Sequence, residues 1–203
     1  MGDLTLTAFL TVDGVTQAPG GPAEDTSGGF RYGGWVAPHF EEDAGRFVDE
    51  NFRKVDAFLL GRVTYDIFAG YWPKVTDPGD LIASQLNSLP KYIASHTRTQ
   101  FDWNNSRHIA DVIREVPLLK QRYSGEIQVH GSGNLAQTLM EHDLIDEYRL
   151  MIFPAVIGSG KRLFGQGTVP GALKLVSSTA TRSGVVMSVY RRAGELVTGT
   201  VGT

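Results

Sequence analysis

The stretch VHGSGNL, residues 129–135, joins a predicted strand at residues 126–129 to a predicted helix at residues 134–142. Because Gly131 and Gly133 have no Cβ atoms, a pyrophosphate can approach the backbone there, and the start of the helix favours its negative charge. The same kind of turn also serves as a plain strand–helix connection. It differs from the Rossmann fingerprint, which places its glycines in the first βα turn and an acidic residue about twenty residues later.

Two other predicted strand ends carry groups suited to holding phosphate. LGRVTY, residues 60–65, offers a tight turn at Gly61, the guanidinium of Arg62 and the hydroxyl of Thr64 near a helix start. IASHTR, residues 93–98, ends a predicted strand with hydroxyl and guanidinium donors. Arg62 is equally consistent with an ordinary surface cation, and polar residues follow most strands. Taken together, the three strand ends predict that residues 61–64, 95–98 and 131–135 meet in space to bind one dinucleotide.

The chain alternates strands and helices up to about residue 150 and then finishes in antiparallel strands, a pattern typical of an α/β fold. The predicted strands are residues 4–12, 55–60, 91–95, 126–129, 146–153, 173–181 and 185–191. The predicted helices are residues 40–52, 63–71, 80–89, 106–119 and 134–142, with Pro117 expected to end the fourth. Ser183-Gly184 signals a hairpin between the last two strands. We expect one domain over residues 1–193 and a frayed tail over residues 194–203.

A long loop at residues 17–38 is rich in glycine and proline but keeps three large aromatic residues, Phe30, Tyr32 and Trp35. Loops of this length are usually either functional or mobile. A surface excursion is one interpretation. The aromatic side chains favour the other, a loop that covers a ligand, because a solvated linker seldom keeps them.

The composition of the 203 residues bounds the function. A net charge of −3, without a run of Lys or Arg, does not favour a general nucleic-acid binder. There is no cysteine, the N-terminus carries Asp3 where a signal peptide would be apolar, and no apolar run approaches the roughly twenty residues that cross a bilayer. We therefore expect a soluble, cytoplasmic protein with no membrane partner.

Other chemistries find little support in the sequence. Gly158-Ser159-Gly160-Lys161 resembles a phosphate loop, but Ala155 stands where its first glycine belongs and Arg162 where Ser or Thr should follow. The five histidines are scattered, so we expect no metal site. No G-x-S-x-G elbow is present, and a hydrolase nucleophile is therefore not visible.

With these motifs in order along the chain, the sequence resembles the dihydrofolate reductase superfamily. It is most similar to stand-alone proteins that resemble the C-terminal reductase domain of the riboflavin-biosynthesis deaminase/reductase. The resemblance rests on LTLTAFLTVDGVT (4–16), LGRVTY (60–65), KYIASHT (91–97), VHGSGNL (129–135) and PAVIGSGKRLF (154–164). It implies a three-layer fold, with a central, mostly parallel sheet flanked by helices and a C-terminal antiparallel hairpin.

The resemblance also implies NADPH as cofactor. The implied cofactor-binding residues are Ala8, Gly61, Arg62, Thr64, Ser95, His96, Arg98, Gly131, Ser132, Gly133, Asn134 and Leu135. Arg62 and Arg98 would favour NADPH over NADH through charge-assisted hydrogen bonds to the extra phosphate. Ala8, Phe9 and the turn at residues 13–17 would line the nicotinamide.

The substrate half of the site departs from the known relatives. Folate reductases carry a carboxylate on the first helix, whereas the stretch GGWVAPHFEED, residues 33–43, has no residue that fits that motif well. Asp13, Glu42, Asp43 and water remain as proton donors. Riboflavin-pathway reductases commonly have Glu before the glycine pair, where this chain has His130. His130 and the aromatic residues Phe30, Tyr32 and Trp35 are the candidates for contact with a small heterocyclic substrate.

Three hypotheses follow for the function. The first is an NADPH-dependent reductase that passes a hydride to a heterocycle. The second is a non-catalytic module that binds a nucleotide, pterin or flavin on the same fold, and the third is an interaction protein that only uses the scaffold. Related reductase domains pair as homodimers, and the apolar LMIF segment, residues 150–153, is either a dimer face or plain core.

Overall fold

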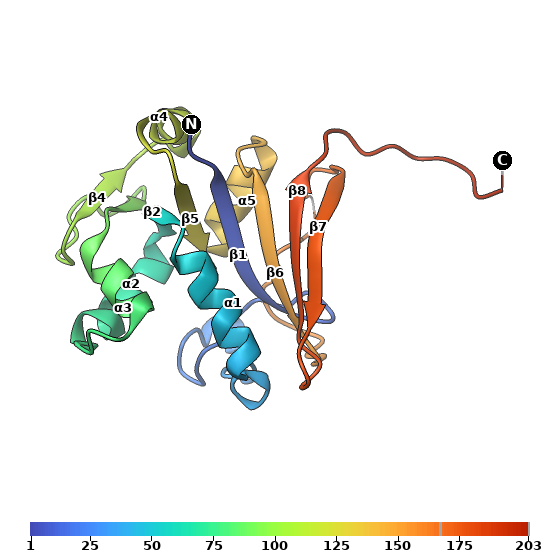
Figure 1. Ribbon diagram of the computed structural model, residues 1–203, viewed down its shortest axis with the longest axis horizontal. Coiled ribbons are helices and arrows are strands. Elements are labelled where there is room, and N and C mark those ends of the chain that lie inside the picture. The colour runs from blue at the N-terminus through green and yellow to red at the C-terminus, as the bar shows by residue number, and fades with distance from the viewer. Residues whose placement is uncertain (167, 203) are drawn as a thin grey trace.

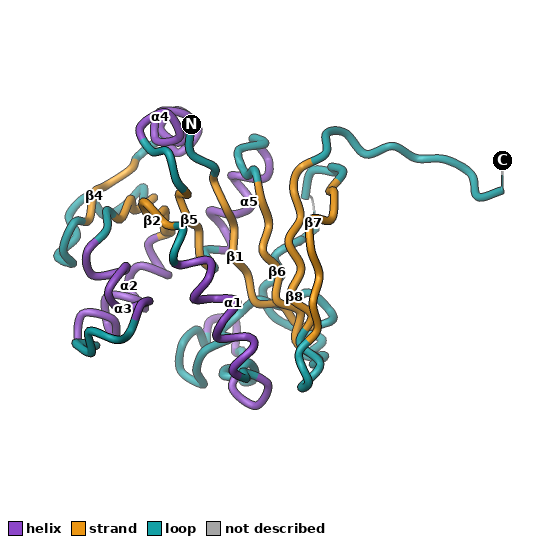
Figure 2. Tube along the Cα trace, in the orientation of Figure 1, coloured by secondary structure: helices purple, strands orange, loops and turns teal. Residues whose placement is uncertain are grey.

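The computed structural model describes residues 1–166 and 168–202 and is built around an eight-stranded sheet (Figures 1 and 2). The strand order is β4-β3-β2-β5-β1-β6-β8-β7. The strands are β1 Leu4–Thr11, β2 Val55–Gly61, β3 Lys91–Ala94, β4 Ser106–Ile109, β5 Glu126–His130, β6 Glu147–Phe153, β7 Leu173–Ala180 and β8 Val186–Arg192. Strands β1 to β6 are parallel, and β8 is antiparallel to both β6 and β7. The carboxyl ends of the parallel strands therefore share one edge of the sheet.

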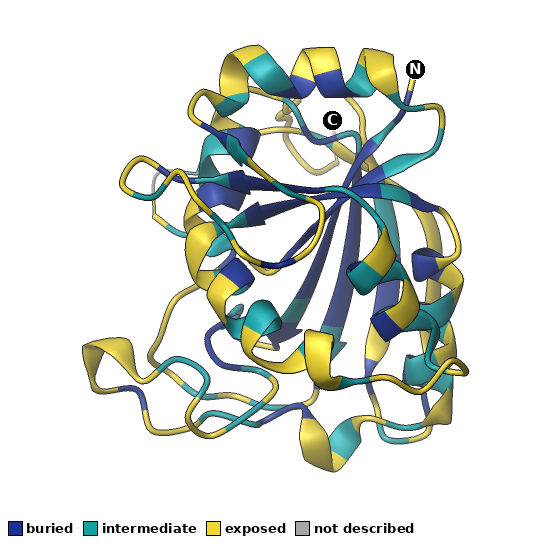
Figure 3. Cartoon of the chain, turned by 90° about the vertical axis from the view of Figure 1, so that its left-hand side faces the viewer, coloured by how far each residue is buried: buried dark blue, intermediate teal, exposed yellow. Residues whose placement is uncertain are grey.

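Helices cover both faces of the sheet, which confirms the three-layer prediction. They are α1 Glu42–Phe52, α2 Arg62–Tyr71, α3 Leu81–Ser88, α4 Val112–Arg122 and α5 Gly133–Glu141, with short 3-10 turns η1 Ser27–Gly29, η2 Ala37–His39 and η3 Trp72–Lys74. One core contains residues of α4 and α5, among them Val116 and Leu139. The other contains residues of α1, α2 and α3, among them Phe52 and Leu86. In Figure 3 the strands form the buried centre between these partly exposed helices.

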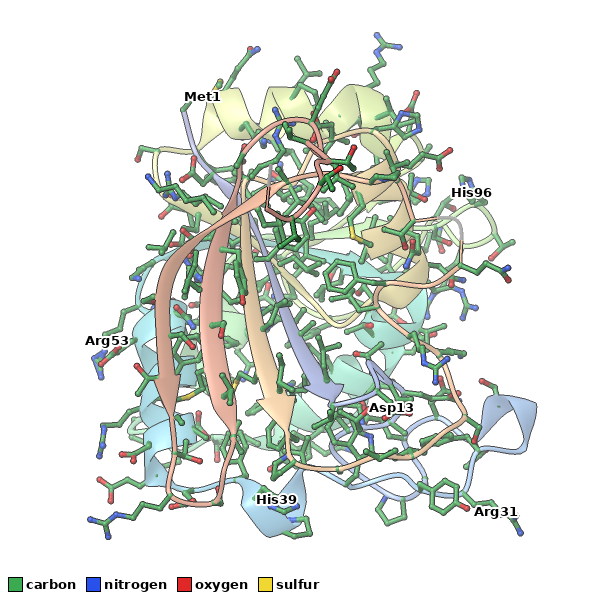
Figure 4. All side chains as sticks on the ribbon, turned by 90° about the vertical axis from the view of Figure 1, so that its right-hand side faces the viewer. Met1, Asp13, Arg31, His39, Arg53 and His96 are labelled. Carbon is green, nitrogen blue, oxygen red and sulfur yellow. The ribbon has the colours of Figure 1, made fainter. Side chains whose placement is uncertain are left out.

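The alternation of side chains along β1 separates the two cores. Leu4, Leu6, Ala8 and Leu10 belong to the core beneath α4 and α5. The intervening residues face α1, and among them Thr5 and Thr7 are polar yet buried. Figure 4 shows β1 running from Met1 at one end of the molecule toward Asp13 at the other, where Arg31 and His39 also lie.

The prediction of one helix over residues 106–119 was wrong. Residues 106–109 form β4, which pairs with β3, and the helix starts only after Asp111, whose carboxylate accepts the Arg114 N–H at 3.1 Å. Helix α4 then continues through Pro117 to Arg122. Pro117 removes the hydrogen bond to the Ile113 carbonyl, but both residues are exposed, so water can satisfy that oxygen.

The LMIF segment belongs largely to the core. Leu150, Met151 and Phe153 are at most 5% exposed, because β6 lies between β1 and β8, and Ile152 is partly buried. Exposed apolar side chains occur on the edge strand β7, at Leu175 and Val176. Beyond β8, residues 194–202 run away from the sheet (Figure 1), and Thr203, the last residue of the predicted tail, lies outside the described residues. No helix in the described chain is long and apolar enough to span a membrane.

Candidate functional site

The turn between β5 and α5 is held in a left-handed conformation. Gly131 has φ 53° and Ser132 has φ 55°. Residues other than glycine seldom adopt such positive φ values. The Ser132 hydroxyl accepts the Gly61 N–H at 2.9 Å and donates to the His130 carbonyl at 3.0 Å. The Ser132 N–H donates to the Thr64 hydroxyl at 3.1 Å. The end of β2 and the glycine turn therefore lie together, as predicted.

Gly61 lies in close contact with the glycine turn. A Cβ atom at Gly61 would lie 3.4 Å from both the Cβ and the hydroxyl of Ser132, at the near limit of ordinary van der Waals contact. The approach brings the start of α2 and the start of α5 to the same point of the sheet edge. Two helix N-termini, each with partial positive charge, consequently face the same region.

The first turn of α5 presents free backbone donors. Ala136 donates the first helical hydrogen bond, to the Ser132 carbonyl at 2.8 Å. Within the described chain, the N–H groups of Gly133, Asn134 and Leu135 have no such acceptor, and the Ser132 side chain does not cap them. The space beside the Gly133 Cα is open. These groups fit a pyrophosphate, which needs several N–H donors and close approach to the backbone.

A pair of arginines from two different strand ends meets on Asp66. The Asp66 carboxylate accepts Arg62 at 3.1 Å and Arg98 at 2.7 Å. Arg98 also lies over the rings of Phe101 and Tyr65, 4.8 and 5.7 Å from their centroids. Both guanidinium groups remain partly exposed, at 44% and 38%. The third strand end thus joins the other two through Asp66, a residue that the sequence analysis missed although it follows Arg62 at the i, i+4 spacing.

The other residues at the end of β3 have different surroundings. The Ser95 hydroxyl is turned to its own loop, where it accepts the N–H groups of Thr97 and Arg98 at 3.3 and 3.0 Å. Ser95 is buried and shapes the turn that presents Arg98. His96 is exposed. On β1, the Ala8 methyl belongs to the core beneath α5, so only the backbone of Ala8 is placed to line a bound ring.

The three carboxylates proposed as proton donors are all engaged. Asp13 accepts the Thr11 hydroxyl at 2.6 Å and the Gly158 N–H at 2.8 Å. The bond from Thr11 and the backbone bonds outweigh the effect of partial burial and hold the pKa of Asp13 well below its usual range. Asp13 is therefore an ionised acceptor that shapes the turn, and it has no proton to give. Glu42 and Asp43 both pair with Arg46 on the exposed side of α1.

The aromatic residues of the long loop divide into two kinds. Trp35 is buried: its indole N–H donates to the Gln17 carbonyl at 2.8 Å, and its ring packs edge-on against Phe153. Phe30 is 7% exposed, whereas Tyr32 is 54% exposed. Phe30 and Trp35 therefore anchor the loop. Tyr32, together with Phe30, lines a hollow of about 360 Å³ between residues 27–32 and residues 159–161.

His130, the last residue of β5, is almost fully buried. Its ring packs against Phe52 and Phe58, with centroid distances of 4.9 and 5.9 Å, and its Nε2 lies 3.1 Å from the Gln128 Oε1. Burial, with the nearby charge of Arg149 adding to it, lowers the pKa of His130 to about 4. The imidazole is consequently neutral at ordinary pH.

Comparison with known proteins identifies the family. The family model "RibD C-terminal domain" matches residues 3–187. The chain belongs to the RibD C-terminal domain family. It is 35% identical over 144 residues to the uncharacterised protein YyaP of Bacillus subtilis, covering 70% of this chain and 76% of YyaP. A second uncharacterised protein of that organism, YwjB, is 26% identical over 137 residues, covering 67% and 74% of the two chains.

Solved structures share the fold. A putative riboflavin biosynthesis protein from a Shewanella species superposes with a TM-score of 0.71 at 20% identity, covering 94% of this chain and 99% of that one. A pyrimidine reductase-like protein from Corynebacterium diphtheriae gives 0.65 at 14% identity, covering 95% and 92%. RibD from Acinetobacter baumannii also gives a TM-score of 0.65, at 12% identity. The superposition covers 95% of this chain and 58% of that one. These likenesses confirm the fold, and the family match over residues 3–187 confirms the resemblance inferred from the sequence.

Proposed function

We propose that this RibD C-terminal domain is an NADPH-dependent reductase that transfers a hydride to a small heterocyclic substrate. The observation that carries the proposal is the link between Gly61, Thr64 and Ser132, which holds two strand ends together beside the free N–H groups of α5. Such a group of donors suits a pyrophosphate bridging the two halves of a dinucleotide. Gly131, Gly133, Asn134 and Leu135 would form that part of the site.

NADPH is favoured over NADH by the paired arginines. Two guanidinium groups held on one carboxylate concentrate positive charge at the sheet edge, close to the start of α2. Guanidinium groups bind phosphate through charge-assisted, often bidentate hydrogen bonds. We assign Arg62 and Arg98 to the phosphate that distinguishes NADPH from NADH.

The bound cofactor would supply the hydride, and the chain's own residues would orient the reactants and exclude water. Catalysis of this kind depends mainly on holding two rings in the right geometry. We place those rings beside the backbone of β1 at Ala8, the turn at Asp13 and the loop anchored by Trp35. Since Asp13 stays ionised and Glu42 and Asp43 pair with Arg46, we propose that the proton comes from water.

For the substrate we propose a pyrimidinone-like heterocycle, in line with the pyrimidine reductase-like and riboflavin-biosynthesis proteins that share the fold. A neutral His130 stands where riboflavin-pathway reductases commonly have Glu. The substrate is therefore expected to meet an uncharged polar group at the end of β5.

The absence of an unpaired carboxylate among the three candidates favours a second function, a non-catalytic nucleotide-binding module. Measurements of NADPH binding and of NADPH oxidation distinguish the reductase from the binding module. A reductase binds NADPH with a rise in melting temperature and oxidises it when an aminouracil or dihydropterin is added. A binding module shows the rise without oxidation, and a chain that shows neither overturns both proposals.

A further inference from the structure

A row of polar side chains lies on the sheet face that packs against α1. Glu126, Gln128 and His130 alternate along β5 and so point to the same face. Thr5 and Thr7 of β1 stand opposite Gln128 and His130 in the strand register. This row lies within the protein interior, where each polar group needs a partner.

The row begins with a carboxylate that is kept ionised. Arg149, only 2% exposed, donates to both oxygens of Glu126 at 2.8 and 2.6 Å. Burial alone would raise the pKa of Glu126, but the hydrogen bonds and charge of Arg149 outweigh it and bring that pKa below its ordinary value. Glu126 is therefore a hydrogen-bond acceptor only.

The ionised Glu126 fixes the orientation of the next side chain. The amide nitrogen of Gln128 donates to the Asn51 carbonyl at 2.7 Å and to Glu126 at 2.8 Å. Turning the amide over would place its oxygen against two acceptor oxygens and leave its nitrogen facing His130. Gln128 Oε1 must therefore face the His130 Nε2, 3.1 Å away.

We propose that Gln128 is a positioning residue that locks His130 as the Nε2–H tautomer and so makes its Nδ1 a hydrogen-bond acceptor for the substrate. An amide oxygen can only accept, so the ring nitrogen facing it must carry the proton. In a neutral imidazole the other nitrogen then carries a lone pair. Within the part of the chain that the structure describes, Nδ1 has no hydrogen-bond partner, and His130 keeps 9% of its surface exposed.

The position of His130 connects this tautomer to the substrate, a step that rests on the proposed function. His130 immediately precedes Gly131 and lies beside Thr7 across the strand pair. The Thr7 hydroxyl is buried and has no partner among the described residues, so the acceptor at this point is Nδ1 alone. An acceptor at Nδ1 suits a ring N–H, a donor that a pyrimidinone presents at its edge. A glutamate at residue 130, as in riboflavin-pathway reductases, would instead present a negative charge to the substrate.

The tautomer is measurable without any ligand, by long-range ¹H–¹⁵N NMR of the histidine side chains near neutral pH. The His130 signals are assigned from their loss in His130→Gln. We expect the wild-type ring to be the Nε2–H form and Gln128→Leu to shift it toward a mixture of both forms. The control Thr5→Val removes a buried, unpartnered hydroxyl opposite Gln128 and should leave the tautomer unchanged.

An Nδ1–H form in the wild-type protein overturns the proposal, and so does a Gln128→Leu ring that keeps the wild-type tautomer. If Gln128→Leu does not fold, the wild-type spectrum still decides. NADPH binding is measured separately, so its absence would count against the proposed reductase and not against the tautomer.

The substrate step is tested with 5,6-diaminouracil and its 1,3-dimethyl derivative, which lacks the ring N–H groups. Methylation should weaken binding to the wild type about fivefold more than binding to His130→Gln, the factor that one net hydrogen bond is typically worth. His130→Gln keeps an N–H donor for Gln128 but loses the acceptor at Nδ1. Equal losses in both proteins, or no binding of 5,6-diaminouracil to the wild type, would overturn the assignment of Nδ1 to this substrate class.

Discussion

The Ser132 hydroxyl accepts the Gly61 N–H at 2.9 Å, although 71 residues separate the two positions. The same hydroxyl donates to the His130 carbonyl, so both of its hydrogen-bonding functions are used inside the protein. Because the hydroxyl is occupied in this way, it holds β2 against β5 and leaves the first N–H groups of α5 uncapped. One side chain thus gives the sheet edge both its rigidity and its free donors.

Replacing this side chain tests the link. In Ser132→Ala the Gly61 N–H loses its acceptor, and we expect the free energy of unfolding to fall by about 1–3 kcal/mol. NADPH affinity should fall as well, because the two strand ends no longer move together. Urea denaturation and fluorescence titration measure the two effects. Ser178→Ala, which removes a hydroxyl pair on the distant hairpin, should leave NADPH affinity unchanged; a Ser132→Ala protein with wild-type affinity would contradict the prediction.

The arginine pair tests the choice of cofactor. Arg98→Ala and Arg62→Ala should each weaken NADPH binding by about tenfold to a hundredfold, the range expected for a hydrogen bond between charged groups. NADH binding should change little, since NADH lacks the additional phosphate. Arg53 is exposed and directly follows the last residue of α1, and it provides the control variant Arg53→Ala. Equal losses of affinity for NADPH and NADH would show that the arginines do not bind the additional phosphate of NADPH.

Sequence motifs of a few residues predicted those parts of the site that single strand–helix turns form. The glycines at 131 and 133, the Gly61-Arg62 pair and the strand–helix order were sufficient to bring three strand ends to one sheet edge. Asp66 was missed because its partner Arg98 lies 32 residues away, and no spacing reports such a contact. The misjudged helix start has a similar cause: Ile109 belongs to a strand, yet it falls in a helical spacing with Val112 and Val116.

The state of His130 also depends on residues that are distant in sequence. The alternation of Glu126, Gln128 and His130 does indicate one polar face of a strand. Only the fold brings Arg149 and the Asn51 carbonyl to that face, and these two groups determine which way the Gln128 amide is turned. The same holds for Phe30 and Trp35, since the sequence cannot distinguish an aromatic ring that anchors a loop from one that covers a ligand.

Burial of His130 predicts a loss of stability in acid. Its pKa is lowered to about 4 in the folded protein from an ordinary value of 6.5, so the unfolded chain binds more protons between these values. The contribution is fully present above pH 6.5 and is lost as the pH falls toward 4, up to about 3 kcal/mol. Denaturation of the wild type and of His130→Gln at pH 7 and pH 4.5 measures it. The wild type should lose more stability than the variant, and an equal loss would assign the effect to other groups.

Lys91 is a second buried titratable group, remote from the candidate site. Its ammonium donates to the carbonyls of Leu86 and Leu89 at 2.6 and 2.9 Å, at the end of α3, and lies 4.5 Å from the centre of the Trp103 ring. Even so, burial lowers the pKa of Lys91 from 10.5 to about 8. The neutral amine still has N–H groups for both carbonyls, so deprotonation need not break these contacts.

We therefore expect the protein to become more stable in mild alkali on account of Lys91. Between pH 8 and 10.5 the unfolded chain holds the Lys91 proton and the folded protein does not, so the free energy of unfolding rises with pH, by at most about 3 kcal/mol. Urea denaturation at pH 7.5 and pH 9.5 tests this in the wild type and in Lys91→Met, which keeps the buried volume without the charge. The variant should lack the rise that the wild type shows, because all other titrating groups are common to both. A parallel pH dependence in the two proteins would mean that Lys91 titrates alike in the folded and unfolded states.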